Sequence, residues 1–123
     1  MNAGRKPVRG STLIRQKQLI HVEGSKDNLN AVKTRKIAPS CFTIGLDDVQ
    51  ELVGRYAGHG TPDQLELHEW SRKEICVTDH IVGYVVTADG KHIPTRAFKI
   101  HYSDNGVHAV PKYDDGEEPD DLG

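Results

Sequence analysis

A chain of 123 residues suits one domain with a modest hydrophobic core and is too short for two. Hydrophobic residues make up 36% and aromatic residues 6%, low shares that predict segments outside the core at the chain ends. No apolar run is long enough to cross a membrane as a helix, which excludes a helical membrane protein.

The net charge of −2 hides a strong asymmetry along the chain. Residues 1–37 carry nine basic and two acidic side chains, a net charge of +7, whereas residues 114–123 carry six acidic side chains and no basic one. Without this acidic tail the rest of the chain is at +4, a sign compatible with a phosphate-bearing partner. The alternative is that both ends are solvated and take no part in binding.

We predict three regions: a flexible basic arm or linker at 1–12, a folded domain at 13–112 and an acidic disordered tail at 113–123. The basic N-terminus lacks an apolar stretch of signal-peptide length. We therefore expect the protein to act in the cytoplasm of the producing or target cell. The alternative is that it is exported, or carried on a virion, by a route that needs no N-terminal signal. Cys41 and Cys76 have no metal-ligand spacing, and free buried thiols are favoured over a disulfide.

The first predicted helix covers Lys26–Lys36, with Ser25 as its N-cap. Its residues at helical spacing are Leu29, Val32 and Arg35.

The second predicted helix has apolar residues at i, i+3 and i+4, with Asp47 and Asp48 in the first turn, where the helix dipole favours acids. Gly58 ends it. Its apolar positions are Leu46, Val49, Leu52, Val53 and Tyr56.

From Leu65 onward the hydrophobic period changes to two, which is typical of strands. Asp89-Gly90 and Asn105-Gly106 are turn signals, the second being the strongest hairpin signal in the chain. Helices followed by an antiparallel meander predict an α+β domain. The predicted strands are 65–70, 75–78, 82–87, 98–103 and 107–110.

A two-residue turn at Asn105-Gly106 would pair Asp104 with Val107 and Ser103 with His108. Because side chains alternate along a strand, an apolar face and a polar face result. The apolar face holds Phe98, Ile100, Tyr102, Val107 and Ala109. The polar face holds Lys99, His101, Ser103 and His108.

This polar face suits cleavage of RNA without a metal ion. Histidine, with an ordinary pKa of about 6.5, suits the two proton transfers. Lys99 or Arg96 would stabilise charge on phosphorus, and Ser103 and Thr95 would orient the phosphate. Two alternatives remain: a solvated sheet face without a function, and a zinc site built on His101 and His108 with a third ligand that the sequence does not indicate.

The hairpin resembles the C-terminal signature of the bacterial polymorphic toxin type 50 family. The signature is a strand reading Ile-His-Tyr-Ser, a turn with Gly and a strand reading His-x-Val-Pro, here at 100–103, Gly106 and 108–111. Two more blocks, at 15–25 and 52–60, are similar to the family's N-terminal and Leu-Val-x-Lys-Tyr-Ala-Gly-x-Gly blocks. The resemblance spans about residues 13–112.

The resemblance implies a ribonuclease fold like that of barnase, EndoU and RelE-type nucleases, in which N-terminal helices pack on an antiparallel sheet that holds the active site. It adds His21 to His101 and His108 as a candidate catalytic residue, and Lys17 to the candidate phosphate-binding residues. The chain departs from the family at Leu19 and Ile20, which precede His21 where a Lys is expected. Asp104 also stands where Lys is frequent.

The sequence thus predicts an RNA endonuclease that needs no metal or other cofactor and cleaves by 2′-hydroxyl attack, leaving a cyclic phosphate. The expected partners are its RNA substrate and an immunity protein, and the chain would belong to a larger toxin or a phage particle. The alternative is a non-catalytic RNA-binding or virion-associated module of the same fold, since phosphate contacts need no chemistry. A metal-dependent nuclease is a third hypothesis.

Overall fold

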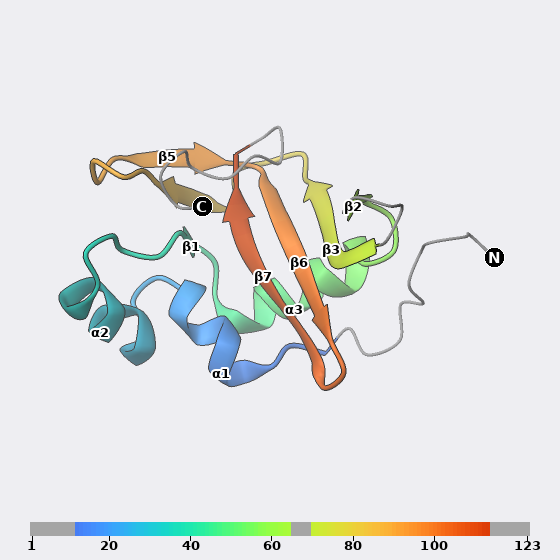
Figure 1. The fold of residues 1–123 in the computed structure, drawn as a ribbon, viewed down its shortest axis with the longest axis horizontal. Coiled ribbons are helices and arrows are strands. Elements are labelled where there is room, and N and C mark those ends of the chain that lie inside the picture. Colours follow the sequence, from blue (N-terminus) through green and yellow to red (C-terminus); the bar gives the residue numbers. More distant parts are fainter. Residues whose placement is uncertain (1–11, 65–69, 114–123) are drawn as a thin grey trace.

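Helices precede most of the strands in the computed structural model, which describes residues 12–64 and 70–113 (Figure 1). The expected arm and tail lie outside these ranges, apart from Thr12 and Tyr113. The helical elements are α1 (Arg15–Gln18), the 3-10 turn η1 (Leu19–His21), α2 (Lys26–Thr34) and α3 (Leu46–Tyr56). The strands are β1 (Cys41–Phe42), β2 (Thr61–Gln64), β3 (Trp70–Val77), β4 (Gly83–Val86), β5 (His92–Thr95), β6 (Ala97–Ser103) and β7 (Gly106–Lys112).

The strands form two antiparallel sheets, which confirms the α+β class. One sheet has the order β2-β3-β6-β7, and the other has the order β1-β4-β5. The expectation of one continuous meander is wrong, because β4 pairs with β1 and leaves β3 to pair with β6. No helix in the described ranges is long and apolar enough to span a membrane.

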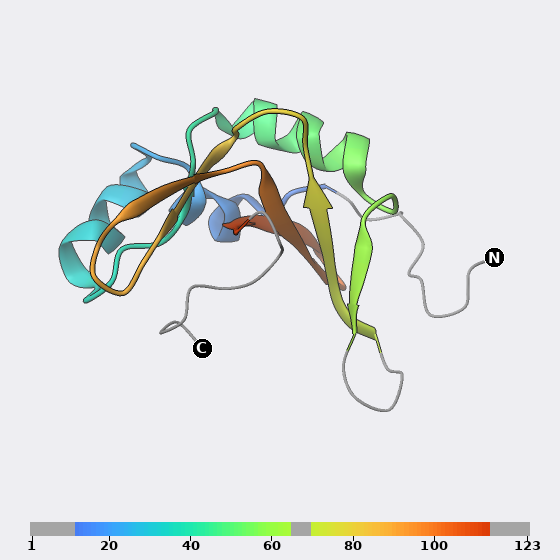
Figure 2. The same cartoon turned by 90° about the horizontal axis from the view of Figure 1, so that it is seen from above.

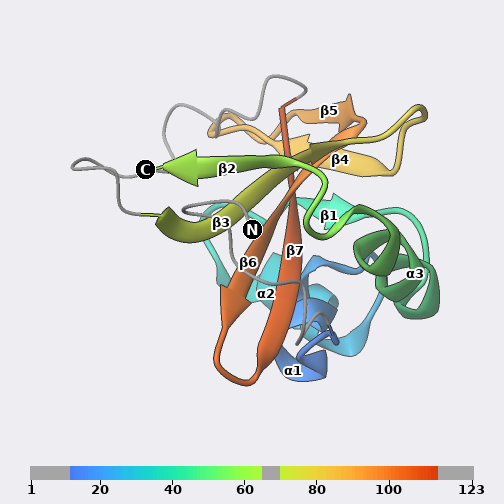
Figure 3. The same ribbon diagram turned by 90° about the vertical axis from the view of Figure 1, so that its right-hand side faces the viewer.

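Helix α3 covers one face of the four-stranded sheet, while α1 and α2 lie beyond its β7 edge (Figures 1 and 2). Figure 3 shows the same arrangement from the side of the β2 edge. Helix α3 confirms the second predicted helix. Its residues Val49, Leu52 and Val53 are buried, and the chain turns away at Gly58, whose φ is +86°. These side chains share one hydrophobic core with Phe98 and Ile100 of β6. The opposite face of β6 and β7 is therefore left for polar groups.

Helix α2 begins as predicted, because the Ser25 hydroxyl accepts a hydrogen bond from the Asn28 backbone N–H at 3.0 Å. The apolar residues at helical spacing do not form its buried face: Leu29 and Val32 are 53% and 51% exposed, whereas Asn28 and Ala31 are buried. Asn28 is satisfied inside because its amide N–H groups donate to the Ile20 carbonyl and the Cys41 sulfur. Polar anchoring therefore decides which side of this helix faces inward.

The predicted strands differ from the observed ones in their bounds, and three strands were missed: β1, β2 and β5. Strand β3 starts at Trp70, and 65–69, the rest of the first expected strand, lies outside the described residues. The turn at Asp89-Gly90 is confirmed, with Gly90 at φ +87°. It leads into β5, whose first three residues are exposed and which contains Pro94, so it lacks the alternating pattern that marks a strand.

The β6–β7 hairpin has a different register from the predicted one. Ser103 pairs with Gly106, so Asp104 and Asn105 form the loop. Gly106 enters β7 at φ +140°, and a Cβ there would lie 2.5 Å from the Thr12 carbonyl oxygen, because residues 12–14 pair with β7. The change moves β7 by two residues relative to β6. Both faces therefore keep their predicted side chains, and His101 lies directly opposite His108.

Candidate active site

Two histidines face each other across the β6–β7 hairpin, on the side of the sheet away from α3. The ring centroids of His101 and His108 are 4.6 Å apart and their planes differ by 19°. Lys73 of β3 pairs with His101 from the other side, so the two imidazoles and an ammonium lie across three adjacent strands. The Nε2 atom of His101 is buried and has no hydrogen-bond partner in the described structure.

A third histidine joins this pair through a buried glutamine. The Gln18 amide donates to the Ala109 carbonyl at 2.9 Å and accepts from the Ala109 N–H at 2.7 Å, so it bonds to β7 as a neighbouring strand would. Gln18 is completely buried, and η1 follows it directly. The His21 ring, at the end of η1, is thereby placed 6.4 Å from that of His108, with 10° between the planes.

The orientation of the His21 ring is fixed by the backbone of Ser40. Its Nδ1 lies 2.8 Å from the Ser40 carbonyl, which can only accept, so Nδ1 carries the proton and donates. The Ser40 hydroxyl in turn accepts from the Val86 N–H at 3.0 Å, which ties this segment to the second sheet. In the neutral ring, Nε2 therefore keeps its lone pair and can take up a proton.

The charged side chains that act most strongly on the three rings are cationic. Lys17 and Lys73 act on His108, while Lys73, Lys99 and Lys112 act on His101. His21 lies near Lys112 and Arg35. Lys99 and Lys112 are buried, so their charges are poorly screened by solvent. The cluster is therefore a site of positive potential that favours an anion.

Burial and these charges keep the imidazoles neutral. Burial lowers the pKa of His21 to about 4, against the raising effect of the Ser40 carbonyl. It also lowers the pKa of His101 to about 3, with further repulsion from His108 and Lys73. The pKa of His108 is lowered by burial and then by Lys17 and Lys73. All three rings are thus bases at neutral pH.

The structure brings five of the eight predicted site residues together: His21, His101, His108, Lys17 and Lys99. Ser103 is on the same face, but its hydroxyl donates to the Gly106 carbonyl at 2.9 Å and closes the hairpin.

The other two predicted residues lie elsewhere. Thr95 is buried, and its hydroxyl donates to the Lys112 carbonyl and accepts from the Ala97 N–H. Arg96 precedes β6, five residues before His101, which corresponds to about 16 Å along an extended strand. Neither is placed with the imidazoles. Asp104, where a basic residue would favour phosphate, pairs with Arg72 at 3.0 Å.

Four residues of the site region were missed by sequence reasoning. Lys112 lies four residues after His108 in β7, so both side chains are on the same face of the strand. Sequence reasoning missed Lys112 because the predicted strand ended at Val110. Lys73 depends on which strand pairs with β6, and Gln18 and Arg35 depend on how the helices dock, so no local pattern indicated them.

The remaining histidines with described positions do not join the cluster. His59 is exposed after α3, His80 pairs with Asp79, and His92 stacks on Tyr84 with 4.2 Å between centroids. Across the described residues, no three His, Cys, Asp or Glu side chains are arranged to hold a metal ion. Cys41 and Cys76 are buried and not disulfide-bonded, as predicted.

Fold and site together define a small α+β domain with three neutral imidazoles in a cationic setting, a class equipped for proton transfer beside an anion. Residues 13–111 match the family described as bacterial toxin 50, and the chain belongs to that family. The resemblance inferred from the sequence motifs is confirmed, and the chain is a toxin-family domain. No curated protein and no solved structure matches it.

Proposed function

We propose that this toxin domain is a metal-independent RNA endonuclease in which His101, His108 and His21 carry out proton transfer. The observation that supports this proposal is the arrangement of three nearly parallel imidazoles, 4.6 and 6.4 Å apart, among lysine side chains. RNA supplies both the anion that such a site favours and an internal nucleophile, the 2′-hydroxyl. The chemistry needs a base, an acid and positive charge.

In the proposed reaction, a neutral imidazole takes the proton of the 2′-hydroxyl, and O2′ attacks phosphorus. The O2′–P bond forms as the P–O5′ bond breaks, and an imidazolium gives its proton to O5′. The products are a 2′,3′-cyclic phosphate and a 5′-hydroxyl. His101 and His108 share the acid and base roles, with a bound phosphate raising the pKa of the ring that becomes the acid. His21 is the third candidate: its Nδ1 donates to the Ser40 carbonyl, which leaves Nε2 to serve as a base.

Lysines would stabilise the charge that builds up on phosphorus in two ways. Lys17 is exposed beside His108 and can contact a phosphate oxygen directly. Lys99 and Lys112 are buried and would act through their field, which needs no rearrangement during the reaction. The Ser103 hydroxyl donates its proton to the Gly106 carbonyl, so it keeps only acceptor sites and would not bind a phosphate oxygen.

The test is cleavage of a fluorescent RNA oligonucleotide by the purified protein in EDTA, with mass spectrometry of the products. We expect cyclic phosphate ends, and no cleavage when the nucleotides carry 2′-O-methyl groups. His101→Ala and His108→Ala should each lower the rate by at least about 100-fold, within the usual range for loss of a general acid or base. The matched controls are His59→Ala and His80→Ala, at exposed histidines away from the cluster.

Three results would overturn this proposal. Full activity in both His101→Ala and His108→Ala would show that neither histidine is catalytic. Loss of activity in EDTA would point to a metal-dependent nuclease. Salt-sensitive binding of RNA without cleavage would favour the non-catalytic RNA-binding module.

We also propose that the cell producing this domain makes an immunity protein that blocks it. A lysine-rich site favours an inhibitor that presents acidic side chains over His108 and Lys17. Co-expression should restore growth and yield a complex that weakens with salt. An inhibitor that protects cells without binding the domain would contradict this.

A further inference from the structure

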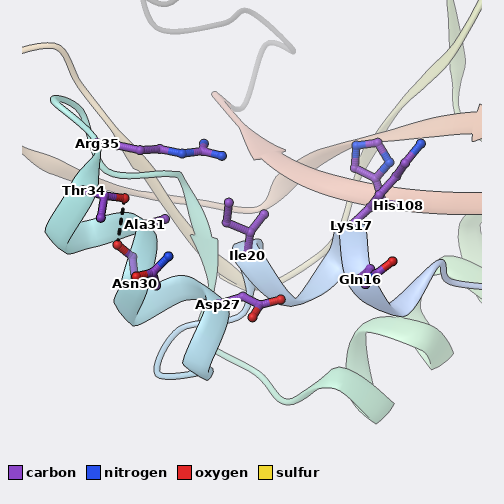
Figure 4. Close-up of a pocket in the computed structure, with 9 residues that line it drawn as sticks. All are labelled: Gln16, Lys17, Ile20, Asp27, Asn30, Ala31, Thr34, Arg35 and His108. Carbon is purple, nitrogen blue, oxygen red and sulfur yellow. Dashed lines mark hydrogen bonds between the residues drawn. The ribbon is translucent and has the colours of Figure 1, made fainter.

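A groove beside the histidine cluster has no role in the proposed proton transfer. It has a volume of about 490 Å³ and lies between α1 and α2, with His108 and Lys17 in its lining (Figure 4). His108 thus belongs to both the cluster and the groove. The groove is of suitable size to hold one nucleotide of a polymer that is cleaved at the cluster.

The groove is cationic toward the cluster and carries a carboxylate on its α2 wall. Figure 4 shows the Arg35 guanidinium directed from the end of α2 toward the side where Lys17 and His108 lie. The Asp27 carboxylate, on the first turn of α2, is directed into the space between α2 and α1. Ile20 lies between Arg35 and Asp27 in this view and supplies apolar surface.

Asp27 is poorly placed to help bind a phosphate. A carboxylate repels phosphate, so this part of the groove calls for a group with N–H or O–H donors. In RNA such donors are the base edges and the 2′-hydroxyl. Asn30 lies on the same wall, one helical turn beyond Asp27, and its amide can both donate and accept.

We propose that this groove binds a guanine base next to the scissile phosphate, with Asp27 as the residue that determines specificity. The proposal rests on the proposed ribonuclease function. Guanine alone among the four RNA bases presents two adjacent N–H donors, N1–H and the N2 amine, which match the two oxygens of one carboxylate. Its O6 can accept from Asn30, and the flat face of the base can pack on Ile20. Arg35 binds the phosphate of that nucleotide.

The test is binding of 2′-O-methyl octanucleotides, which lack the free 2′-hydroxyl and cannot be cleaved by the proposed route. One is a run of uridines with a single central guanosine, and the others carry adenosine or inosine there. We expect the wild-type protein to bind the guanosine probe about tenfold more tightly than the adenosine probe, as one good bidentate base contact provides. Inosine, which lacks the N2 amine, should fall between them.

Asp27→Asn should abolish this preference while leaving the affinity for the adenosine probe within about twofold. The matched control is Asp48→Asn, which also removes an acid from the first turn of a helix but lies in α3. Arg35→Gln should weaken all probes equally and lower the salt dependence, whereas Lys33→Gln, on α2 but outside the groove lining, should not.

Equal binding of all probes by the wild type, or an unchanged guanosine preference in Asp27→Asn, would overturn the proposal. These outcomes are distinguishable from failure of the ribonuclease. If the groove reads guanine but the domain is not a nuclease, the binding preference persists and RNA stays intact. If the domain is a nuclease without this subsite, RNA is cut without preference for guanosine and Asp27→Asn changes nothing.

Discussion

Gln18 bonds through its side chain to both backbone groups of Ala109, the residue that follows His108 in β7. This pair of bonds joins the helical segment that ends in His21 to the strand that carries His108. Residues separated by 87 positions in sequence therefore keep a ring separation of 6.4 Å. The Gln18 amide thus makes the two backbone hydrogen bonds that a further strand would make in a wider sheet.

Replacing Gln18 should both destabilise the protein and disorganise the site. Gln18→Ala leaves two buried backbone groups unsatisfied, so we expect a loss of about 2–4 kcal/mol in the free energy of unfolding, measured with urea. At temperatures where the variant stays folded, cleavage should still fall on the order of tenfold, because His21 loses its position relative to His108. The control is Arg15→Ala, an exposed position of the same helix, which should change stability by less than about 0.5 kcal/mol.

The hairpin depends on a glycine for two reasons that can be separated. At Gly106 the φ of +140° strains any other residue, and a Cβ would also collide with the Thr12 carbonyl. Gly90 has a φ of +87°, but a Cβ added there would point into open space. We expect Gly90→Ala to cost about 1 kcal/mol, the strain of a left-handed conformation, and Gly106→Ala to cost roughly 2 kcal/mol more. Equal urea midpoints for the two variants would show that the contact with Thr12 adds nothing.

The faces of the hairpin could be predicted from sequence although its register could not. Strand alternation depends only on parity, and the error in register was two residues, so Lys99, His101 and His108 stayed on one face. The register itself is set by Thr12, which approaches β7 so closely that only Gly106 fits opposite it. That contact joins the two ends of the domain, and a local turn preference carries no information about it.

Contacts between distant elements also explain why other features of the structure could not be predicted from the sequence. Leu29 and Val32 have the spacing of a buried helix face, but the hydrogen bonds of Asn28 hold α2 the other way round. Lys73 reaches the cluster only because β4 and β5 leave the four-stranded sheet and let β3 pair with β6. Periodicity indicates that a side chain has a preferred side, and tertiary contacts decide what lies there.

Acid should destabilise the protein through its depressed histidines. The pKa of His21 is about 4 and that of His101 about 3 when folded, whereas an unfolded histidine has an ordinary pKa of about 6.5. As the pH falls below 6.5 the unfolded chain binds protons that the folded chain does not, so stability is full above 6.5 and is lost progressively toward pH 4 and 3. Urea midpoints across pH 7.5 to 4 should show this slope. It should be flatter in His21→Gln and in His101→Gln than in the wild-type protein.

Binding of a phosphate should reverse the sign of these shifts, because an anion stabilises the imidazolium form that burial and the lysines oppose. Proton NMR of the imidazole Hε1 signals, with assignment by substitution, can follow each ring with and without a 2′-O-methyl dinucleotide. In the free protein we expect His21, His101 and His108 to titrate below 6.5. With the dinucleotide bound, at least one of the three should move upward by about one unit or more, since an opposite charge nearby has effects of that size. The control is the chemical shifts of His59 and His80, which are exposed and away from the cluster and should be the same with and without the dinucleotide. If all three stay depressed in the complex, no imidazole of the cluster can act as the acid at neutral pH, and the proton for O5′ must come from elsewhere.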